Sequence, residues 1–342
     1  MTNTTTQIVL LDAPVIPGLR FRLFAGESDL QANVELNNVC AKADKGEYVD
    51  TMEQARHWLA HLDDKHNPYT DMIIAEIDGV PGMVGKGLAS WMSNDDGEWL
   101  AQLYGWVHPD WRHKGIGRAI QGWIEQRGRE LLLVRTPAGA HCFFESWNGD
   151  HMLGKAALLT ACNYTATRFT RMMVRPLDEP IPELGLPEGL EVRPTRSRDE
   201  LRPIFEAFNE AFRDHWGHRE WTDSDFQGWY DEPDLDTSLY QVAWDIASDQ
   251  IAGGVLTHVS KKQNEALGQK RGWTDPIAVR RPWRKRGVAK ALIARSFHIL
   301  KEQGMTEAAL GVDTQNPNGA YKLYESMGYR IHRSGTVWRK SM

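Results

Sequence analysis

The chain has few cysteines and no long apolar run. Its 342 residues include three cysteines, Cys40, Cys142 and Cys162, which form no disulfide framework and show no metal-ligand spacing. No stretch approaches the ~18 consecutive apolar residues of a membrane-spanning helix, and the N-terminus lacks the basic segment of a signal peptide. These absences predict a cytoplasmic protein that binds no metal and no membrane.

An excess of positive charge is also missing. The formal net charge is −6 at pH 7, which does not favour nonspecific binding to nucleic acid. An apolar content of 41% and a charged content of 25% are ordinary for a globular protein. A chain of 342 residues is expected to form about two domains.

The basic residues gather in short segments instead, and one of these begins at Val279. It runs to Ala291 and reads V-R-R-P-W-R-K-R-G-V-A-K-A. A predicted strand precedes it and apolar residues at helical spacing follow it, so it forms a strand-to-helix turn. The first N–H groups of a helix have no internal partner, and the helix dipole is positive there. Such a turn is suited to binding a pyrophosphate group.

The same segment occurs earlier in the chain, from Val107 to Ala119. It reads V-H-P-D-W-R-H-K-G-I-G-R-A, and five of its residues match the later copy at one constant offset (for example, 284 − 112 = 172). An internal repeat of about half the chain is therefore predicted. Two other phosphate-binding motifs are excluded, because no G-x-x-x-x-G-K-[ST] is present and Gly115-Ile116-Gly117 does not continue as G-x-G-x-x-G.

The order of predicted elements repeats as well. Each half is predicted to be an α/β domain with a central mixed β-sheet flanked by helices. In the second half a strand over 270–279 leads into the turn, and helices follow over 288–303 and 318–327. Residues 1–17 are predicted to form an N-terminal extension, 18–175 the first domain, 176–188 a linker rich in proline and acidic residues, and 189–342 the second domain.

The pattern R-x-x-G-x-G/A between a strand and a helix resembles the acyl-CoA pyrophosphate loop of the GCN5-related N-acetyltransferases, the GNAT superfamily. Two copies in register, each followed by the family's order of elements, carry this resemblance over nearly the whole chain after the extension. It implies two tandem GNAT domains and acetyl-CoA as the co-substrate. The residues that it implies for acetyl-CoA binding are Val107, Arg112, His113, Lys114, Gly115, Gly117 and Arg118 in the first half, and Ile277, Val279, Arg284, Lys285, Arg286, Gly287, Val288 and Ala289 in the second.

The second half also resembles the last motif of the family, N-x-x-A-x-x-L-Y-E-x-x-G-F/Y. The chain reads N-P-N-G-A-Y-K-L-Y-E-S-M-G-Y from Asn316. In the family the Asn contacts the pantetheine–phosphate arm and the Tyr protonates the leaving thiolate, which implies these roles for Asn316 and Tyr324. A phenol with a reference pKa of about 10 suits a thiolate of comparable basicity. The alternative for Tyr324 is a purely structural packing role.

The first half lacks the proton donor, because Leu159 stands where Tyr324 does (324 − 159 = 165) and Asn148 matches Asn316 only loosely. This division resembles the tandem GNAT proteins of the mycothiol synthase type, whose C-terminal domain does the chemistry. It implies an N-acetyltransferase in which an amine attacks the thioester directly in a ternary complex. A non-catalytic acyl-CoA-binding or sensor protein is the alternative.

The general base and the acceptor site are less clearly marked. Asp275 is the best-placed carboxylate on the approaching strand, and a solvated role before Pro276 stays equally open. The segment 212–232 interleaves aromatic and acidic side chains, which suits a cationic amine, although an amphipathic helix would show the same pattern. We expect a small-molecule amine acceptor and a monomer or homodimer. The predicted acceptor-binding residues are Asp214, His215, Trp216 and Trp221.

Overall fold

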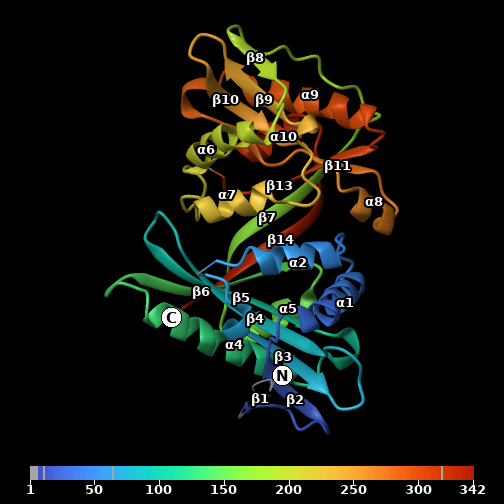
Figure 1. Cartoon of the computed structure of the whole chain (residues 1–342), viewed down its shortest axis with the longest axis vertical. Coiled ribbons are helices and arrows are strands. Elements are labelled where there is room, and N and C mark those ends of the chain that lie inside the picture. Colours follow the sequence, from blue (N-terminus) through green and yellow to red (C-terminus); the bar gives the residue numbers. More distant parts are fainter. Residues whose placement is uncertain (1–6, 11, 64, 317–318) are drawn as a thin grey trace. The chain divides into compact units, whose positions relative to one another are not determined.

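The computed structural model describes residues 7–10, 12–63, 65–316 and 319–342. It divides into two compact units (Figure 1). The N-terminal unit comprises residues 1–167 and 336–342, and the C-terminal unit comprises residues 168–335. Residues 1–6 and 11 of the predicted extension, and residues 317–318 near the start of the predicted last helix, lie outside the described residues.

The sheet of the N-terminal unit is mixed. Neighbouring strands pair antiparallel from β1 to β5, and β5 pairs parallel with β6. The last residues of the chain run along this sheet, where the Met342 N–H donates to the Cys142 carbonyl at 3.0 Å. The strands are β1 (Gln7–Ile8), β2 (Leu19–Leu23), β3 (Met72–Ile77), β4 (Gly85–Ser93), β5 (Glu98–Val107), β6 (His141–Gly149) and parts of β7 (Thr165–Pro176) and β14 (Arg330–Ser341).

Helices cover both faces of this sheet because its central strands are apolar on both sides. On β3, Ile73 and Ala75 pack in the cluster with α4, whereas Met72 and Ile74 pack in the cluster with α1 and α2. Side chains alternate across a strand, so these pairs face opposite sides. The helices are α1 (Glu27–Ala43), α2 (Met52–Ala60), α3 (Pro68–Asp71), α4 (Ile116–Leu133) and α5 (Leu153–Ala161), with the 3-10 helix η1 at Pro109–Trp111.

The C-terminal unit holds two groups of strands. The order β12-β10-β9-β8 is antiparallel throughout. In the other group β13 pairs antiparallel with β7 and parallel with β11. The strands are β8 (Leu190–Arg193), β9 (Gln241–Asp245), β10 (Gln250–Val255), β11 (Arg271–Trp273), β12 (Ile277–Val279), β13 (Glu307–Asp313), and parts of β7 and β14.

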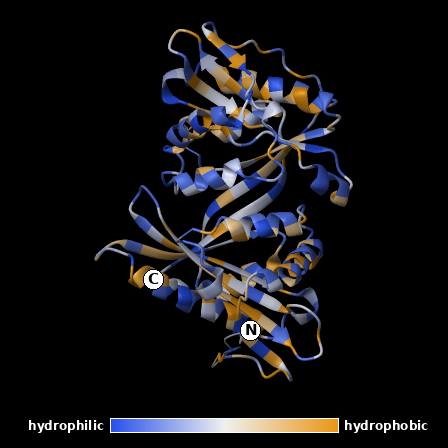
Figure 2. Cartoon of the chain, viewed as in Figure 1, coloured by the Kyte–Doolittle hydropathy of each residue, from blue (hydrophilic) through white to orange (hydrophobic). Residues whose placement is uncertain are grey.

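Helices again cover both faces. Ala243 and Ala252 pack in the cluster with α9, and their neighbours Val242 and Ile251 pack in the cluster with α6. The outer helices therefore carry hydrophobic and hydrophilic residues side by side (Figure 2). The helices are α6 (Leu201–Phe212), α7 (Asp223–Tyr230), α8 (Lys261–Leu267), α9 (Val288–Glu302) and α10 (Ala320–Ser326), with 3-10 helices η2 (Arg198–Glu200), η3 (Thr237–Leu239) and η4 (Arg281–Trp283).

The two units do not divide where composition suggested. The predicted first domain ended at residue 175, yet residues 168–176 of β7 belong to the C-terminal unit, where Thr170–Pro176 pairs with β13. The predicted second domain ran to residue 342, yet residues 336–342 belong to the N-terminal unit. Strand pairing, which links residues far apart in the sequence, decides to which unit a residue belongs.

The predicted linker at 176–188 is not a free spacer. Leu177 is fully buried in the core of the C-terminal unit, and Ile181 and Leu186 pack against that core. The Arg175 guanidinium donates hydrogen bonds to the carbonyls of Pro176 and Pro180 and so holds the segment in place. Among the described residues, no helix is both long and apolar enough to span a membrane.

Candidate active site

The two basic turns have the same backbone conformation. His113 and Lys285 have φ angles of 60° and 59°, and the glycines two residues later, Gly115 and Gly287, have φ angles of 91° and 89°. This left-handed region favours glycine, which explains why both copies have one there. Each glycine caps a long helix, α4 or α9. The first N–H groups of each helix are therefore available to an anion.

Each turn is braced by its arginine. In the N-terminal unit, the Arg112 Nε donates to the Val107 carbonyl at 3.0 Å. Its two terminal nitrogens bind the two carboxylate oxygens of Asp44 at 2.6 and 2.8 Å. Asp44 caps the C-terminus of α1. The guanidinium thus ties together the end of β5, the turn and α1.

The C-terminal unit repeats this brace. The Arg284 Nε donates to the Val279 carbonyl at 2.9 Å, and its other nitrogens donate to the Asp214 carboxylate and to the Ala211 carbonyl. Asp214 follows α6 as Asp44 follows α1, at nearly the same repeat offset (214 − 44 = 170). This shared offset is the sequence signal that could have identified both aspartates as partners of the turn arginines, and the sequence-based prediction did not include it.

The brace engages the side chains of two predicted site residues. Asp214 was predicted to bind the amine acceptor, but its carboxylate pairs with both Arg281 and Arg284. These arginines hold the pKa of Asp214 well below its usual range. With its side chain bound in this way, Arg284 supports the turn, whereas Lys285 and Arg286 are exposed.

We expect Asp214→Asn to lower the free energy of unfolding by about 1–3 kcal/mol, the usual worth of hydrogen bonds to charged groups. A carboxylate with a depressed pKa stabilises the fold above its unfolded pKa of about 3.9 and loses that contribution as the pH falls. The difference in free energy of unfolding between parent and variant, measured by urea unfolding, should therefore become smaller below about pH 4.

Asp223→Asn is the matched control for this prediction. Its carboxylate pairs with Arg202, but its side chain is 91% exposed, against 23% for Asp214. An exposed ion pair contributes about 0–1 kcal/mol. Equal losses in the two variants would contradict the brace.

The strand that leads into the second turn is broken, contrary to the continuous strand predicted over 270–279. Its first part, β11, pairs with β13, and its last part, β12, pairs with β10. Thr274, Asp275 and Pro276 lie at the break. Among the described residues β12 is the edge strand of its group, so one side of Ile277–Val279 is available for strand addition by an extended ligand.

Asp275 and Tyr324 are electrostatically coupled at this break. Burial raises the pKa of Asp275, while the charge of His258 and a hydrogen bond from the Gly311 N–H at 3.1 Å oppose that shift. Burial and the charge of Asp275 together raise the pKa of Tyr324. The pair therefore combines a carboxylate of raised basicity with a phenol that stays protonated at neutral pH. His258 had not been predicted, and no sequence motif marks it.

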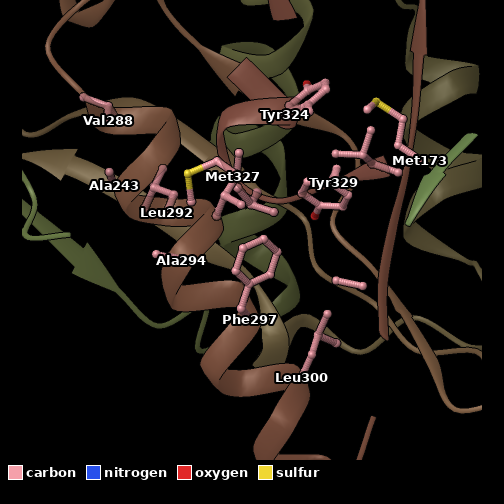
Figure 3. Packing of buried hydrophobic residues seen from close by; sticks show 14 of the residues in the cluster. Met173, Ala243, Val288, Leu292, Ala294, Phe297, Leu300, Tyr324, Met327 and Tyr329 are labelled. Atoms are coloured by element: carbon pink, nitrogen blue, oxygen red, sulfur yellow. The ribbon is translucent and has the colours of Figure 1, made fainter. Parts of the chain in front are cut away.

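The surroundings of Tyr324 separate it from its neighbour Tyr329. Both belong to one core cluster with Phe297 and Met327 (Figure 3), and the two tyrosine rings lie 6.1 Å apart. The Tyr329 hydroxyl is hydrogen-bonded to the Thr274 hydroxyl. Within the described part of the chain, the Tyr324 hydroxyl has no hydrogen-bond partner.

The other second-half residues predicted to bind acetyl-CoA lie around the break and the turn. Gly287 is exposed, whereas the Val288 side chain is buried in the core, which leaves only its backbone for a ligand. Ile277, Val279, Ala289 and Asn316 are partly exposed.

In the N-terminal unit, β5 and β6 pair as far as Gln102 and Glu145. Beyond that point a cavity of about 740 Å³ is lined by the end of β5, the turn and α5. Six of the seven predicted first-half residues line the cavity: Val107, Arg112, His113, Gly115, Gly117 and Arg118. The seventh, Lys114, places its ammonium group 4.4 Å from the Trp111 ring centre.

The remaining predicted acceptor residues pack against the body of the C-terminal unit. His215 stacks on Phe212 at 4.3 Å, and Trp221 packs on the same ring at 5.6 Å. The Trp216 ring lies under the Arg168 guanidinium at 4.6 Å. Burial, followed by the charges of neighbouring groups, lowers the pKa of His215. The packing of these aromatic side chains leaves their predicted role at the acceptor site a prediction.

Comparison with known proteins assigns the family. The Acetyltransferase (GNAT) family matches residues 201–329. A mycothiol acetyltransferase of Salinispora arenicola is 30% identical over 275 residues, which cover 80% of this chain and 82% of the relative. The chain belongs to the GNAT family of acetyltransferases. A mycothiol acetyltransferase of Salinispora tropica is 32% identical over 231 residues, 65% of the GNAT chain and 67% of the relative.

Solved structures share the fold of this GNAT chain. A GCN5-related N-acetyltransferase from Sphaerobacter thermophilus has a TM-score of 0.69 at 24% identity and covers 94% of this chain and 95% of its own. A tandem GNAT protein from the clavulanic acid biosynthesis pathway has a TM-score of 0.66 at 14% identity, with coverages of 94% and 98%. The predicted family, the N-acetyltransferase class and the fold of two tandem α/β GNAT domains are confirmed.

Proposed function

We propose that this GNAT protein transfers an acetyl group from acetyl-CoA to a primary amine of a small molecule, and that the C-terminal unit holds the active site. The observation that carries the proposal is the coupling of Asp275 and Tyr324 at the break between β11 and β12. The N-terminal unit has Leu159, which cannot donate a proton, at the position of Tyr324.

The residues around the break and turn fit acetyl-CoA. The left-handed turn at Lys285–Gly287 and the start of α9 offer backbone N–H groups for the diphosphate. The free edge of β12 suits the amides of the pantetheine arm. Asn316 lies between β13 and α10, and we assign it to the same arm from its match to the family motif.

The reaction forms a C–N bond between the amine and the acetyl carbon and breaks the C–S bond of the thioester. The Asp275 carboxylate accepts the proton that the amine loses, directly or through water, and its raised pKa makes it the stronger base. The Tyr324 hydroxyl donates its proton to the departing sulfur. A backbone N–H near Val279 stabilises the negative charge that develops on the carbonyl oxygen.

The N-terminal unit has a different role in this proposal. It keeps the turn, the brace and a cavity, which support CoA binding, but it lacks the phenol. We therefore assign it to binding CoA without turnover.

The acceptor is tested by monitoring thiol release from acetyl-CoA in the presence of amines. The panel contains simple amines, amino sugars, aminoglycosides and peptides, together with the unacetylated precursor of mycothiol, because the relatives are named mycothiol acetyltransferases. Release with one class establishes the reaction and the chemistry of the acceptor. Binding of acetyl-CoA with no release across the panel would overturn the proposed reaction.

A further inference from the structure

The cavity of the N-terminal unit contains a cation that the second half lacks. Lys155 lies in the first turn of α5 and lines the cavity together with His113, Gly115 and Gly117 of the basic turn. The start of α5 is close to that turn, since a Cβ atom at Gly154 would lie 3.9 Å from the His113 ring. The Lys155 side chain therefore lines the same cavity as the helix N-terminus that is expected to bind phosphate.

A comparison of the two halves indicates what this lysine replaces. His113 occupies the position of Lys285 (285 − 113 = 172) with nearly the same φ angle, so the first turn has lost a permanent charge there. When the last helices are aligned on Leu159 and Tyr324, Lys155 stands at the position of Ala320 (320 − 155 = 165). One positive charge is thus absent from the turn and present on the facing helix.

Two of the other cations near the turn are already engaged, and a third, Arg118, lines the cavity with an exposed side chain. Arg112 is held by Asp44 and by the Val107 carbonyl, and Lys114 lies over the Trp111 ring. Lys155 differs, because among the described residues no hydrogen bond or ion pair holds its ammonium group. A partly buried amine without an acceptor is unfavourable, and an anionic ligand in the cavity would supply the acceptor.

We infer that Lys155 is the diphosphate-binding cation of the N-terminal cavity and that its charge takes the place of the lysine missing from the turn. The ligand class is a nucleotide diphosphate joined to a pantetheine arm, as in CoA. The inference rests on the proposed CoA-binding role of the N-terminal unit. It adds a binding residue that the motif of the turn does not contain.

This assignment predicts a proton uptake on binding. Burial lowers the pKa of Lys155 to about 8, and the Asp44 carboxylate partly opposes that shift. A bound diphosphate favours the charged amine, so above about pH 8 the site takes up a proton when ligand binds. The other titratable and charged groups that line the cavity are Cys40, Arg112, His113, Arg118 and His151.

The experiment measures CoA binding to the full chain by titration calorimetry at pH 9, in two buffers with different ionisation enthalpies. We expect two sites in the parent, with uptake of about one proton at the N-terminal site. Lys155→Met keeps the apolar stem but should weaken that site about 10- to 100-fold, as expected for loss of a charged hydrogen bond, and should remove the proton uptake. Lys155→Arg should retain binding without uptake, since arginine stays charged.

A charge-relocation variant makes the test specific. Adding His113→Lys to Lys155→Met should restore most of the lost affinity, because it returns the cation to the turn. Lys42→Met removes an exposed lysine outside the cavity lining; it is the matched control and should change the affinity less than about threefold. A single CoA site in the parent would overturn the proposed role of the N-terminal unit and this inference with it. Two sites that Lys155→Met leaves unchanged, or weakened binding that His113→Lys fails to restore, would overturn only the inference.

Discussion

Replacing Tyr324 with phenylalanine should lower the rate of acetyl transfer by ~10²–10⁴-fold, the usual contribution of a positioned general acid. The variant keeps the buried ring and its packing beside Tyr329 and loses only a hydroxyl that makes no hydrogen bond to any described residue. We therefore expect the fold and the affinity for acetyl-CoA to be unchanged. The measurements are thiol release at saturating substrates and calorimetric binding of acetyl-CoA.

Tyr321→Phe is the control for this prediction, because Tyr321 lies on the same helix and its hydroxyl interacts with Glu325. Its removal should leave the rate within about twofold of the parent, as expected for a surface group. Unchanged turnover in Tyr324→Phe would assign the residue to packing alone. A parallel loss of acetyl-CoA binding would also contradict the acid role.

Asp275→Asn should abolish most of the transfer without destabilising the protein. The loss should reach ~10²–10³-fold, because the amide cannot accept the proton of the amine. Burial raises the pKa of Asp275, so the ionised carboxylate opposes folding at pH values above that pKa. The free energy of unfolding of the parent therefore falls as the pH rises from the unfolded pKa of about 3.9 towards the folded pKa. The asparagine variant should then be as stable as the parent at pH 7, or more stable.

The pH–rate profile separates this role from a structural one. In the parent, the rate should fall as Asp275 becomes protonated on the acidic side, and this limb should be absent from the residual activity of Asp275→Asn. Asp249→Asn removes an exposed carboxylate that pairs with Arg193 and should leave the profile unchanged. Destabilisation of Asp275→Asn together with an unaltered profile would show that the carboxylate serves the fold.

Under the proposed function, the two copies of one duplicated turn serve two purposes. Both halves keep the left-handed turn and the arginine brace, including an aspartate at the end of the preceding helix. These features maintain the shape of the turn and are independent of chemistry. Catalysis requires further groups at the strand break, and only the C-terminal unit has the phenol. A change at Tyr324 is therefore expected to affect turnover, and a change in either brace to affect stability.

Local patterns in the sequence determined the fold class, the internal repeat and the position of the basic turns. The repeat at an offset of 172, the basic turns and the alternation of strands and helices predicted two α/β domains of one family. These features depend on residues close together in the chain, where glycine conformation, helix capping and apolar spacing act. The motif also distinguished Tyr324 from Leu159, because a single position carries that difference.

Contacts between distant residues decided the rest. The orientation of the Arg284 side chain depends on its hydrogen bond to Asp214, which lies 70 residues away in the sequence. The assignment of residues 168–176 to the C-terminal unit depends on the pairing of β7 with β13. The coupling of Asp275 with Tyr324 and the place of Lys155 in the cavity also arise only when the strands and helices pack. Burial and neighbouring charge set the pKa of a side chain and the partner of a guanidinium, and both are properties of the folded neighbourhood that no local pattern contains.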